Sequence, residues 1–336
     1  MANEDAIWTP EPGVYQDVPA ETYHICPYAS SSKLGHLVPP STPAKLKTAL
    51  DEPVEKKVWR EGRALHCAVF EPARYAAQYR VAGTCIGMTK GGERCKLIGA
   101  IPVQGGEVCG KHADQYEREP DVLLVSPVDA AMVERAAASI RAHPLARAIV
   151  DSTTAMRELS LVWDQPVPAL SLEQEPIVVR MKARLDIYDP ELFGGLPADL
   201  KGVREAHTRE FQKQALWNGY LRQSVIYRWA LRHHGMPFRT FVGLAAEKTA
   251  PFDLIVYRIG DEATGLIWQE GEPAVHVSKS VLLLLRLWHE CTTRGVWPGY
   301  PREIVTLTTP EWAWSEIDRQ CDALQERIDS FKERED

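Results

Sequence analysis

The pattern of apolar and polar positions is clearest in residues 177–188, where apolar side chains recur at every second position: Ile177, Val179, Met181, Ala183, Leu185 and Ile187. A period of two predicts a strand that buries this set and places Asp186 on the opposite, charged face. The turn segment DPELFGGLP follows, and ADLKG after it predicts an adjacent antiparallel strand. In that hairpin Asp199 and Lys201 share one face, and Asp199 lies close to Asp186.

Helical patterns surround these strands. Residues 1–29 are a proline-bearing, extended lead-in, after which Ser30 to Ser32 are typical helix caps. A helix that contains EGRALHCAVF ends near Pro72, Ser126 caps an alanine-rich helix, and residues 208–234 are again helical. Two further strands, FVGLAAEK and FDLIVYRI, precede the buried helix SVLLLLRLWHECTTR. This order predicts an α/β sandwich around a mixed sheet.

The composition is that of a globular protein, with 45% apolar and 25% charged residues in 336 positions. No apolar run is long enough to cross a bilayer, and the N-terminus lacks the order of a secretion signal, so we expect a cytoplasmic protein without a membrane partner. Seven cysteines, an odd number, argue against a disulfide framework.

The net charge of −7 argues against a protein coated by nucleic acid, but the charge is unevenly distributed. Residues 201–232 hold only two acidic residues and seven basic ones: Lys201, Arg204, Arg209, Lys213, Arg222, Arg228 and Arg232. Such an excess is expected of a groove that faces phosphates. A solvated basic helix face is the alternative, and the sequence leaves it open.

Asp186, Asp199 and Lys201 are the residue types of a magnesium-dependent nuclease centre. Two carboxylates at the end of a sheet can bind one or two divalent ions, and a nearby lysine can orient water and offset developing charge. The alternative is an ordinary strand end, because an aspartate and a lysine two positions apart are common.

Further motifs occur with these residues in a characteristic order: YHICPYASSSKLGHL, EGRALHCAVFEP, RELSLVW, RLD, ADLKG, GYLRQSVIYRWAL, VWPGY and PEWA. Over residues 14–310 this order resembles the PD-(D/E)xK nuclease superfamily, its RecB-like branch, and most of all the RecE (exonuclease VIII) type of phage recombination nuclease. The resemblance implies a restriction-endonuclease-like core, a central mixed sheet flanked by helices.

The resemblance also implies roles for individual residues. His66, Asp186 and Asp199 match the positions that bind catalytic Mg²⁺ (or Mn²⁺), and Lys201 matches the catalytic lysine. Gly202 stands where the family usually has threonine or serine, which removes a hydroxyl group but no metal ligand.

Three more positions match the family's pattern. Gln223 and Tyr227 match the helix that closes the site, and their spacing of four residues puts them on one helical face. Glu158 matches a further acidic position. The basic residues expected to contact DNA are Arg204, Arg209, Lys213, Arg222 and Arg228.

The function implied by the resemblance is 5′-to-3′ digestion of linear double-stranded DNA from its ends, in phage-type homologous recombination. Such an enzyme would be bacterial or phage-encoded, would form a ring-like homo-oligomer and would leave a 3′ overhang for a single-strand annealing protein. Two alternatives stay open: a RecB-like nuclease of other polarity or an endonuclease, for example in phage defence, and a catalytically silent DNA-binding module of the same fold.

A segment rich in glycine and cysteine interrupts the helical part of the chain. Cys85, Cys95, Cys109 and His112 form a complete tetrahedral zinc set, closed and therefore structural. Unrelated thiols and an iron–sulfur cluster are the alternatives. We therefore expect four parts: 1–81, the helical part that carries His66; 82–113, the zinc-binding insert; 114–310, the nuclease core; and 311–336, a C-terminal helix.

Overall fold

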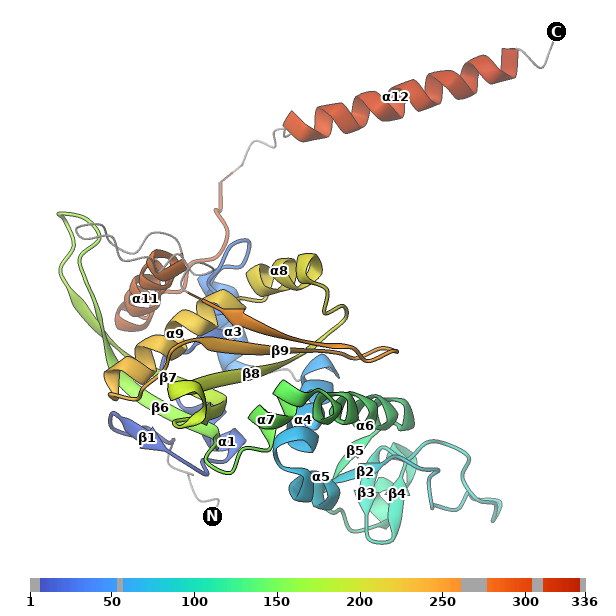
Figure 1. Ribbon diagram of the computed structural model, residues 1–336. Coiled ribbons are helices and arrows are strands. Elements are labelled where there is room, and N and C mark those ends of the chain that lie inside the picture. The colour runs from blue at the N-terminus through green and yellow to red at the C-terminus, as the bar shows by residue number, and fades with distance from the viewer. Residues whose placement is uncertain (1–6, 53–56, 261–276, 304–310, 333–336) are drawn as a thin grey trace. The chain divides into compact units, whose positions relative to one another are not determined.

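The computed structural model describes residues 7–52, 57–260, 277–303 and 311–332. Two compact units divide the chain, Met1–Trp297 and Pro298–Asp336. The first is built on a six-stranded sheet of order β1-β6-β7-β8-β9-β10, in which β8 and β9 are parallel and all other neighbours antiparallel (Figure 1). The strands are β1 (Gly13–Tyr15), β6 (Met156–Val167), β7 (Ile177–Asp189), β8 (Leu196–Val203), β9 (Phe241–Glu247) and β10 (Leu254–Ile259). The predicted mixed sheet is confirmed.

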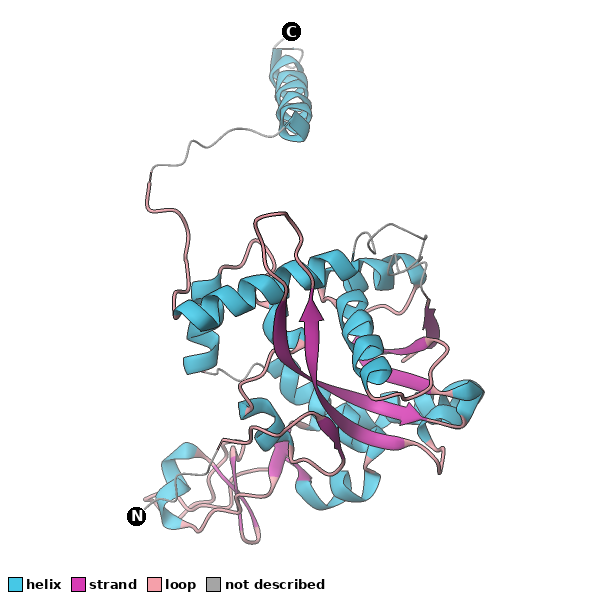
Figure 2. Ribbon diagram, turned by 90° about the vertical axis from the view of Figure 1, so that its left-hand side faces the viewer, coloured by secondary structure: helices cyan, strands magenta, loops and turns pink. Residues whose placement is uncertain are grey.

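Helices cover both faces of the sheet (Figure 2). On one face α2, α9 and α11 pack over β6 and β7, and Trp163 and Leu285 are fully buried between them. On the other face α4, α6 and α7 pack over β8 and β9 around Leu200 and Ile140. These helices are α2 (Ser31–Gly35), α4 (Lys57–Phe70), α6 (Pro127–Ala142), α7 (Pro144–Val150), α9 (Tyr220–His233) and α11 (Val277–Arg294).

Strand β7 is confirmed, with its odd-numbered side chains buried from Val179 onward, but its opposite face is largely buried as well from Lys182 to Tyr188. Lys182 is only 1% exposed, and its ammonium group donates to the backbone carbonyls of Tyr23 and Cys26 at the end of α1 (Ala20–Ile25). The sequence pattern predicted an extended lead-in here. Instead this segment covers the charged face of β7, because its carbonyls provide partners for a buried cation.

Serine caps appear where the sequence predicts them, and proline shapes two helix boundaries. Ser30 caps α2 and Ser126 caps α6. The helix expected to end near Pro72 ends at Phe70, and Pro72 begins the short helix α5 (Pro72–Gln78). Pro144 likewise begins α7, because proline lacks the N–H that a helix interior needs. Further helices among the described residues of this unit are α3 (Pro43–Asp51), α8 (Thr208–Trp217) and the short η2 (Leu192–Gly194).

The cysteine-rich insert leaves and rejoins this unit through two paired strands, β2 (Tyr79–Val81) and β5 (Leu123–Val125). Between them lie the hairpin of β3 (Ile101–Val103) and β4 (Gly106–Val108) and the 3₁₀ helix η1 (Gly110–Gln115). The insert has a small core of its own, in which the cysteines pack with Val103 and Val108.

The second unit contains α12 (Glu311–Lys332), which lies within the segment 311–336 where the sequence predicts a C-terminal helix. Parts of three predictions lie outside the described residues: residues 1–6 and 53–56 of the N-terminal helical part, residues 261–276 and 304–310 of the core, and the last four residues of the helix. Among the described helices, none combines the length and apolar character that a membrane span requires.

Candidate functional site

The backbone of Leu200 in β8 fixes two predicted site residues from different elements. Its N–H donates to Oδ2 of Asp186 in β7 at 2.8 Å, and its carbonyl lies 3.0 Å from Nε2 of His66 in α4. A carbonyl oxygen only accepts, so Nε2 carries the proton and Nδ1 keeps a lone pair. Nδ1 lies 3.5 Å from the same Asp186 oxygen. The imidazole therefore presents its free ligand atom to the carboxylate.

Glu158 completes a three-residue cluster. The register of β6 on β7 runs from Arg157–Ile187 to Leu159–Leu185, which places Glu158 across from Asp186. The backbone at Glu158 has a φ of 50°, in the left-handed region. One ligand atom each from His66, Glu158 and Asp186 lie within 4.8 Å of one another. These three side chains could hold a metal ion.

The electrostatics of this cluster are unfavourable without a cation. Burial, and then the negative charges of Asp199 and Glu158, raise the pKa of Asp186 well above its ordinary value. Burial also raises the pKa of Glu158 to about 7, although Arg184, 3.8 Å away, opposes the rise. Burial lowers the pKa of His66, which keeps the imidazole neutral and able to bind a metal.

Asp199 and Lys201 form an ion pair beside this cluster. The Lys201 ammonium contacts Oδ2 of Asp199 and lies 4.7 Å from the ring centroid of Tyr220. Burial acts to lower the pKa of Lys201, but the charges of Asp199 and Asp186 outweigh it, and the net shift is upward. Lys201 is therefore a charged group in a buried site.

The face of α9 that was predicted to close the site does contact it. The Gln223 amide donates to Oδ1 of Asp199 at 3.1 Å and to the Tyr227 hydroxyl at 2.7 Å. Tyr227 in turn donates to the carbonyl of Arg184 in β7. Asp199 is thus held by Lys201 on one oxygen and Gln223 on the other, and it lies next to the three-residue cluster without being part of it.

Gly202 has limited space for the threonine or serine side chain that the resemblance leads one to expect here. A Cβ there would lie 3.2 Å from Cδ of Lys248 and 3.5 Å from the Leu65 side chain. Lys248 is itself paired with Glu61 at 3.1 Å. The glycine therefore fits a local packing in which this lysine lies close to β8. Sequence reasoning gave no signal for Lys248.

The basic side chains of residues 201–232 differ in how exposed they are to solvent. Arg204, Arg209 and Lys213 are exposed, and Arg222 is half-buried. Arg228 is only 2% exposed, and its guanidinium donates to the carbonyl of Ile259. The prediction of a DNA contact is therefore corrected for Arg228, because α9 buries this side chain against the end of β10.

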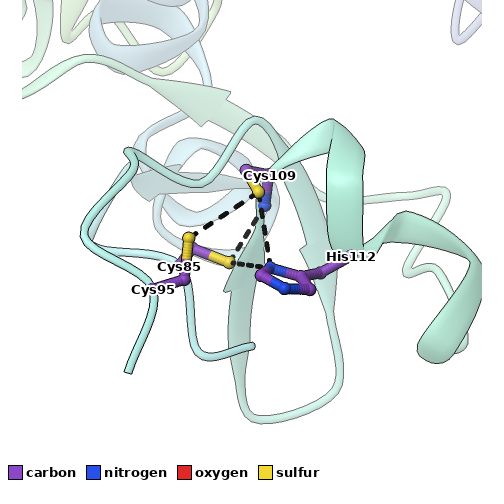
Figure 3. Close-up of side chains that lie close together, drawn as sticks. All are labelled: Cys85, Cys95, Cys109 and His112. Atoms are coloured by element: carbon purple, nitrogen blue, oxygen red, sulfur yellow. Dashed lines mark hydrogen bonds between the residues drawn. The ribbon is translucent and has the colours of Figure 1, made fainter. Parts of the chain in front are cut away.

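The insert brings all four predicted cysteine and histidine ligands together (Figure 3). Sγ of Cys95 and Sγ of Cys109 are 3.9 Å apart, and Nδ1 of His112 lies 3.3 Å from Cys85 and 3.5 Å from Cys109. Metal–sulfur bonds of about 2.3 Å and a metal–nitrogen bond of about 2.0 Å at tetrahedral angles require separations of about 3.8 and 3.5 Å. The three separations therefore fit one tetrahedral ion, and all four ligand atoms lie within 4.8 Å of one another.

The surroundings of Cys85 favour a thiolate ligand. Burial acts to raise its pKa, but backbone N–H groups of Cys109 and Gly87 donate to the sulfur, at 3.2 and 3.4 Å. Together with His112, these donors lower the pKa of Cys85 to about 6. A thiolate is the form of cysteine that binds a metal.

Comparison with known proteins gives structural neighbours only. No protein-family model and no curated protein matches the sequence. Among solved structures, the chain is similar to a candidate exonuclease from Eubacterium rectale, with 12% identity over 88% of this chain and 96% of that one, and a TM-score of 0.49. It is also similar to the protein SSO0001, with 14% identity over 52% of this chain and 68% of the other, and a TM-score of 0.27. Likeness at this level leaves the function to be argued from the site.

Proposed function

We propose that this chain is a Mg²⁺-dependent (or Mn²⁺-dependent) deoxyribonuclease that hydrolyses phosphodiester bonds at the ends of linear double-stranded DNA. One observation carries the proposal: a partly buried cluster of His66, Glu158 and Asp186 lies against the Asp199–Lys201 ion pair. The order of motifs that resembles PD-(D/E)xK nucleases supports it independently of the geometry.

The donor set fits a divalent cation. Two carboxylates and a neutral imidazole converge, and burial, followed by the charges of nearby acidic groups, raises the pKa values of Asp186 and Glu158. Bound here, a divalent ion would polarise the scissile phosphate and stabilise the departing 3′ oxygen. Asp199, held beside the cluster by Gln223, is the further acid that we expect to take part in metal binding.

Lys201 is the residue that acts on the attacking water. Its ammonium group stays charged at neutral pH because Asp199 and Asp186 raise its pKa. It can hold a water oxygen in place and offset the charge that develops on the phosphate. Gln223 and Tyr227 act indirectly, since their hydrogen bonds fix Asp199 and tie α9 to β7.

Further parts of the proposal rest on the family resemblance. Digestion runs from 5′ to 3′ and leaves a 3′ overhang for a single-strand annealing protein, and the enzyme works as a ring-like homo-oligomer in homologous recombination. For the insert, we propose a structural zinc ion on Cys85, Cys95, Cys109 and His112. The support is the spacing of their four ligand atoms, which leaves no open coordination position.

The deciding experiment offers the purified protein two DNA substrates with and without Mg²⁺. We expect end-labelled linear duplex to be degraded and covalently closed circles of the same sequence to survive, with Asp199→Ala as the inactive control. Equal digestion of circles would replace the exonuclease by an endonuclease. Digestion of neither substrate in Mg²⁺ or Mn²⁺ would refute the nuclease proposal and favour the silent DNA-binding module.

A further inference from the structure

The outer face of α8 carries apolar side chains that the fold does not use. Trp217 is 81% exposed, the highest value for any tryptophan, tyrosine or phenylalanine among the described residues, and Leu216 is 62% exposed. The inner face of the helix is anchored separately by buried Phe211, whose ring stacks on Tyr257 with centroids 4.5 Å apart. Trp217 therefore contributes little to the core, and its exposure calls for another reason.

Cations share this outer face with the tryptophan. Arg209, Lys213 and Trp217 follow one another at intervals of four residues, so the three side chains lie in one row along the helix. Both cations are exposed, and Lys213 keeps this exposure while it pairs with Glu210 at 2.6 Å. Lysine is depleted from protein–protein interfaces, whereas a row of cations that ends in an exposed aromatic ring suits nucleic acid.

The row ends beside the candidate nuclease site. Asn218, directly after Trp217, donates to the hydroxyl of Tyr220 at 3.2 Å, and the Tyr220 ring lies 4.7 Å from the Lys201 ammonium. Between them Gly219 makes the turn into α9 with a φ of 74°. A Cβ at this glycine would lie 2.1 Å from the Arg222 guanidinium, so another residue here would displace the end of that side chain.

We propose that Trp217 stacks on a base of single-stranded DNA whose phosphates lie along Arg209 and Lys213, and that α8 leads this strand towards Lys201. The inference rests on the proposed function, because it identifies the strand that enters the same site. An indole ring stacks on any base, so the contact adds affinity for a frayed or single-stranded end without sequence preference.

The test measures binding of a fluorescently labelled oligothymidine strand by anisotropy, with Ca²⁺ in place of Mg²⁺ and strand integrity checked on a gel. Trp217→Ala should bind roughly 5- to 150-fold more weakly, the range for loss of one stacked base. Trp217→Phe should recover part of the loss, and Trp217→Leu less. Trp314→Ala removes another exposed tryptophan, 55% exposed in α12, and should bind like the wild type.

A strand that carries abasic sites isolates the stacking contribution. Wild type and Trp217→Ala should bind this strand equally, because it offers phosphates but no bases. The inference would be overturned if wild type and Trp217→Ala bound the normal strand equally. It would also be overturned if Trp217→Ala lost the same affinity for the abasic strand as for the normal strand. A changed oligomeric state in Trp217→Ala with unchanged DNA binding would instead make this face an interface between copies.

The inference and the proposed function can fail separately. Trp217-dependent binding of single strands in a protein that digests no DNA would leave the stacking contact standing and remove the nuclease. If the protein digests linear duplex but Trp217→Ala binds single strands like the wild type, the nuclease proposal stands and the stacking contact is refuted. The melting temperature of each variant checks that it is folded.

Discussion

Replacing Glu158 by glutamine should stabilise the metal-free protein and weaken its response to metal. Folding raises the pKa of Glu158 from 4.5 to about 7. The protonated side chain therefore contributes fully to the free energy of unfolding below about pH 4.5, and this contribution is lost as the pH rises through about 7. At 1.36 kcal/mol per pKa unit, the ionised carboxylate costs at most roughly 3 kcal/mol at pH 8. Because its side chain is 31% exposed, solvent screening reduces this to about 2 kcal/mol.

Thermal melts at pH 8 and pH 5.5, in EDTA-free buffer with and without Mg²⁺, measure both effects. The metal-free Glu158→Gln protein should melt higher than the wild type at pH 8, by a few degrees, with a smaller difference at pH 5.5. The rise in melting temperature that Mg²⁺ produces at pH 8 should be smaller in the variant, because one ligand is lost. A variant that is less stable at pH 8 without metal, or that responds to Mg²⁺ like the wild type, would refute the reasoning.

Three further predictions concern the candidate active site, the insert and the basic stretch. Asp199→Ala and Lys201→Ala should each abolish Mg²⁺-dependent digestion in a gel assay while DNA binding persists, and near-normal activity in either would contradict their roles. Cys109→Ser should lower both the melting temperature and the zinc content found by elemental analysis. Cys321→Ser, which lies outside the cluster, should change neither. If elemental analysis of the folded wild type finds iron or no metal, the zinc proposal is wrong. Arg222→Ala should reduce the salt dependence of duplex binding by about one phosphate contact, and an unchanged slope would leave this residue with a packing role only.

The fold could be predicted from the sequence wherever one local rule decides the structure. The alternation in β7 identifies its core face, and Ser30 and Ser126 cap helices because a serine hydroxyl satisfies a free backbone N–H. What local rules miss is burial by distant segments. Nothing near Lys182 indicates that the carbonyls of Tyr23 and Cys26 will cover it, and the same applies to Arg228, which is basic by sequence but inaccessible in the helix packing.

In the candidate site, too, contacts between residues close in sequence could be predicted, whereas contacts between distant residues could not. Asp199 and Lys201 are close in sequence, so their shared face follows from strand geometry alone. Glu158 is different, because β6 begins some thirty residues before Asp186 and only the register of the two strands brings them together. The left-handed φ at Glu158 then departs from the regular strand. Backbone strain of this kind persists where the surrounding structure enforces it and is concentrated at functional positions. The geometry of Glu158 is therefore an argument for metal binding that residue spacing could not supply, and the glutamine substitution tests it directly.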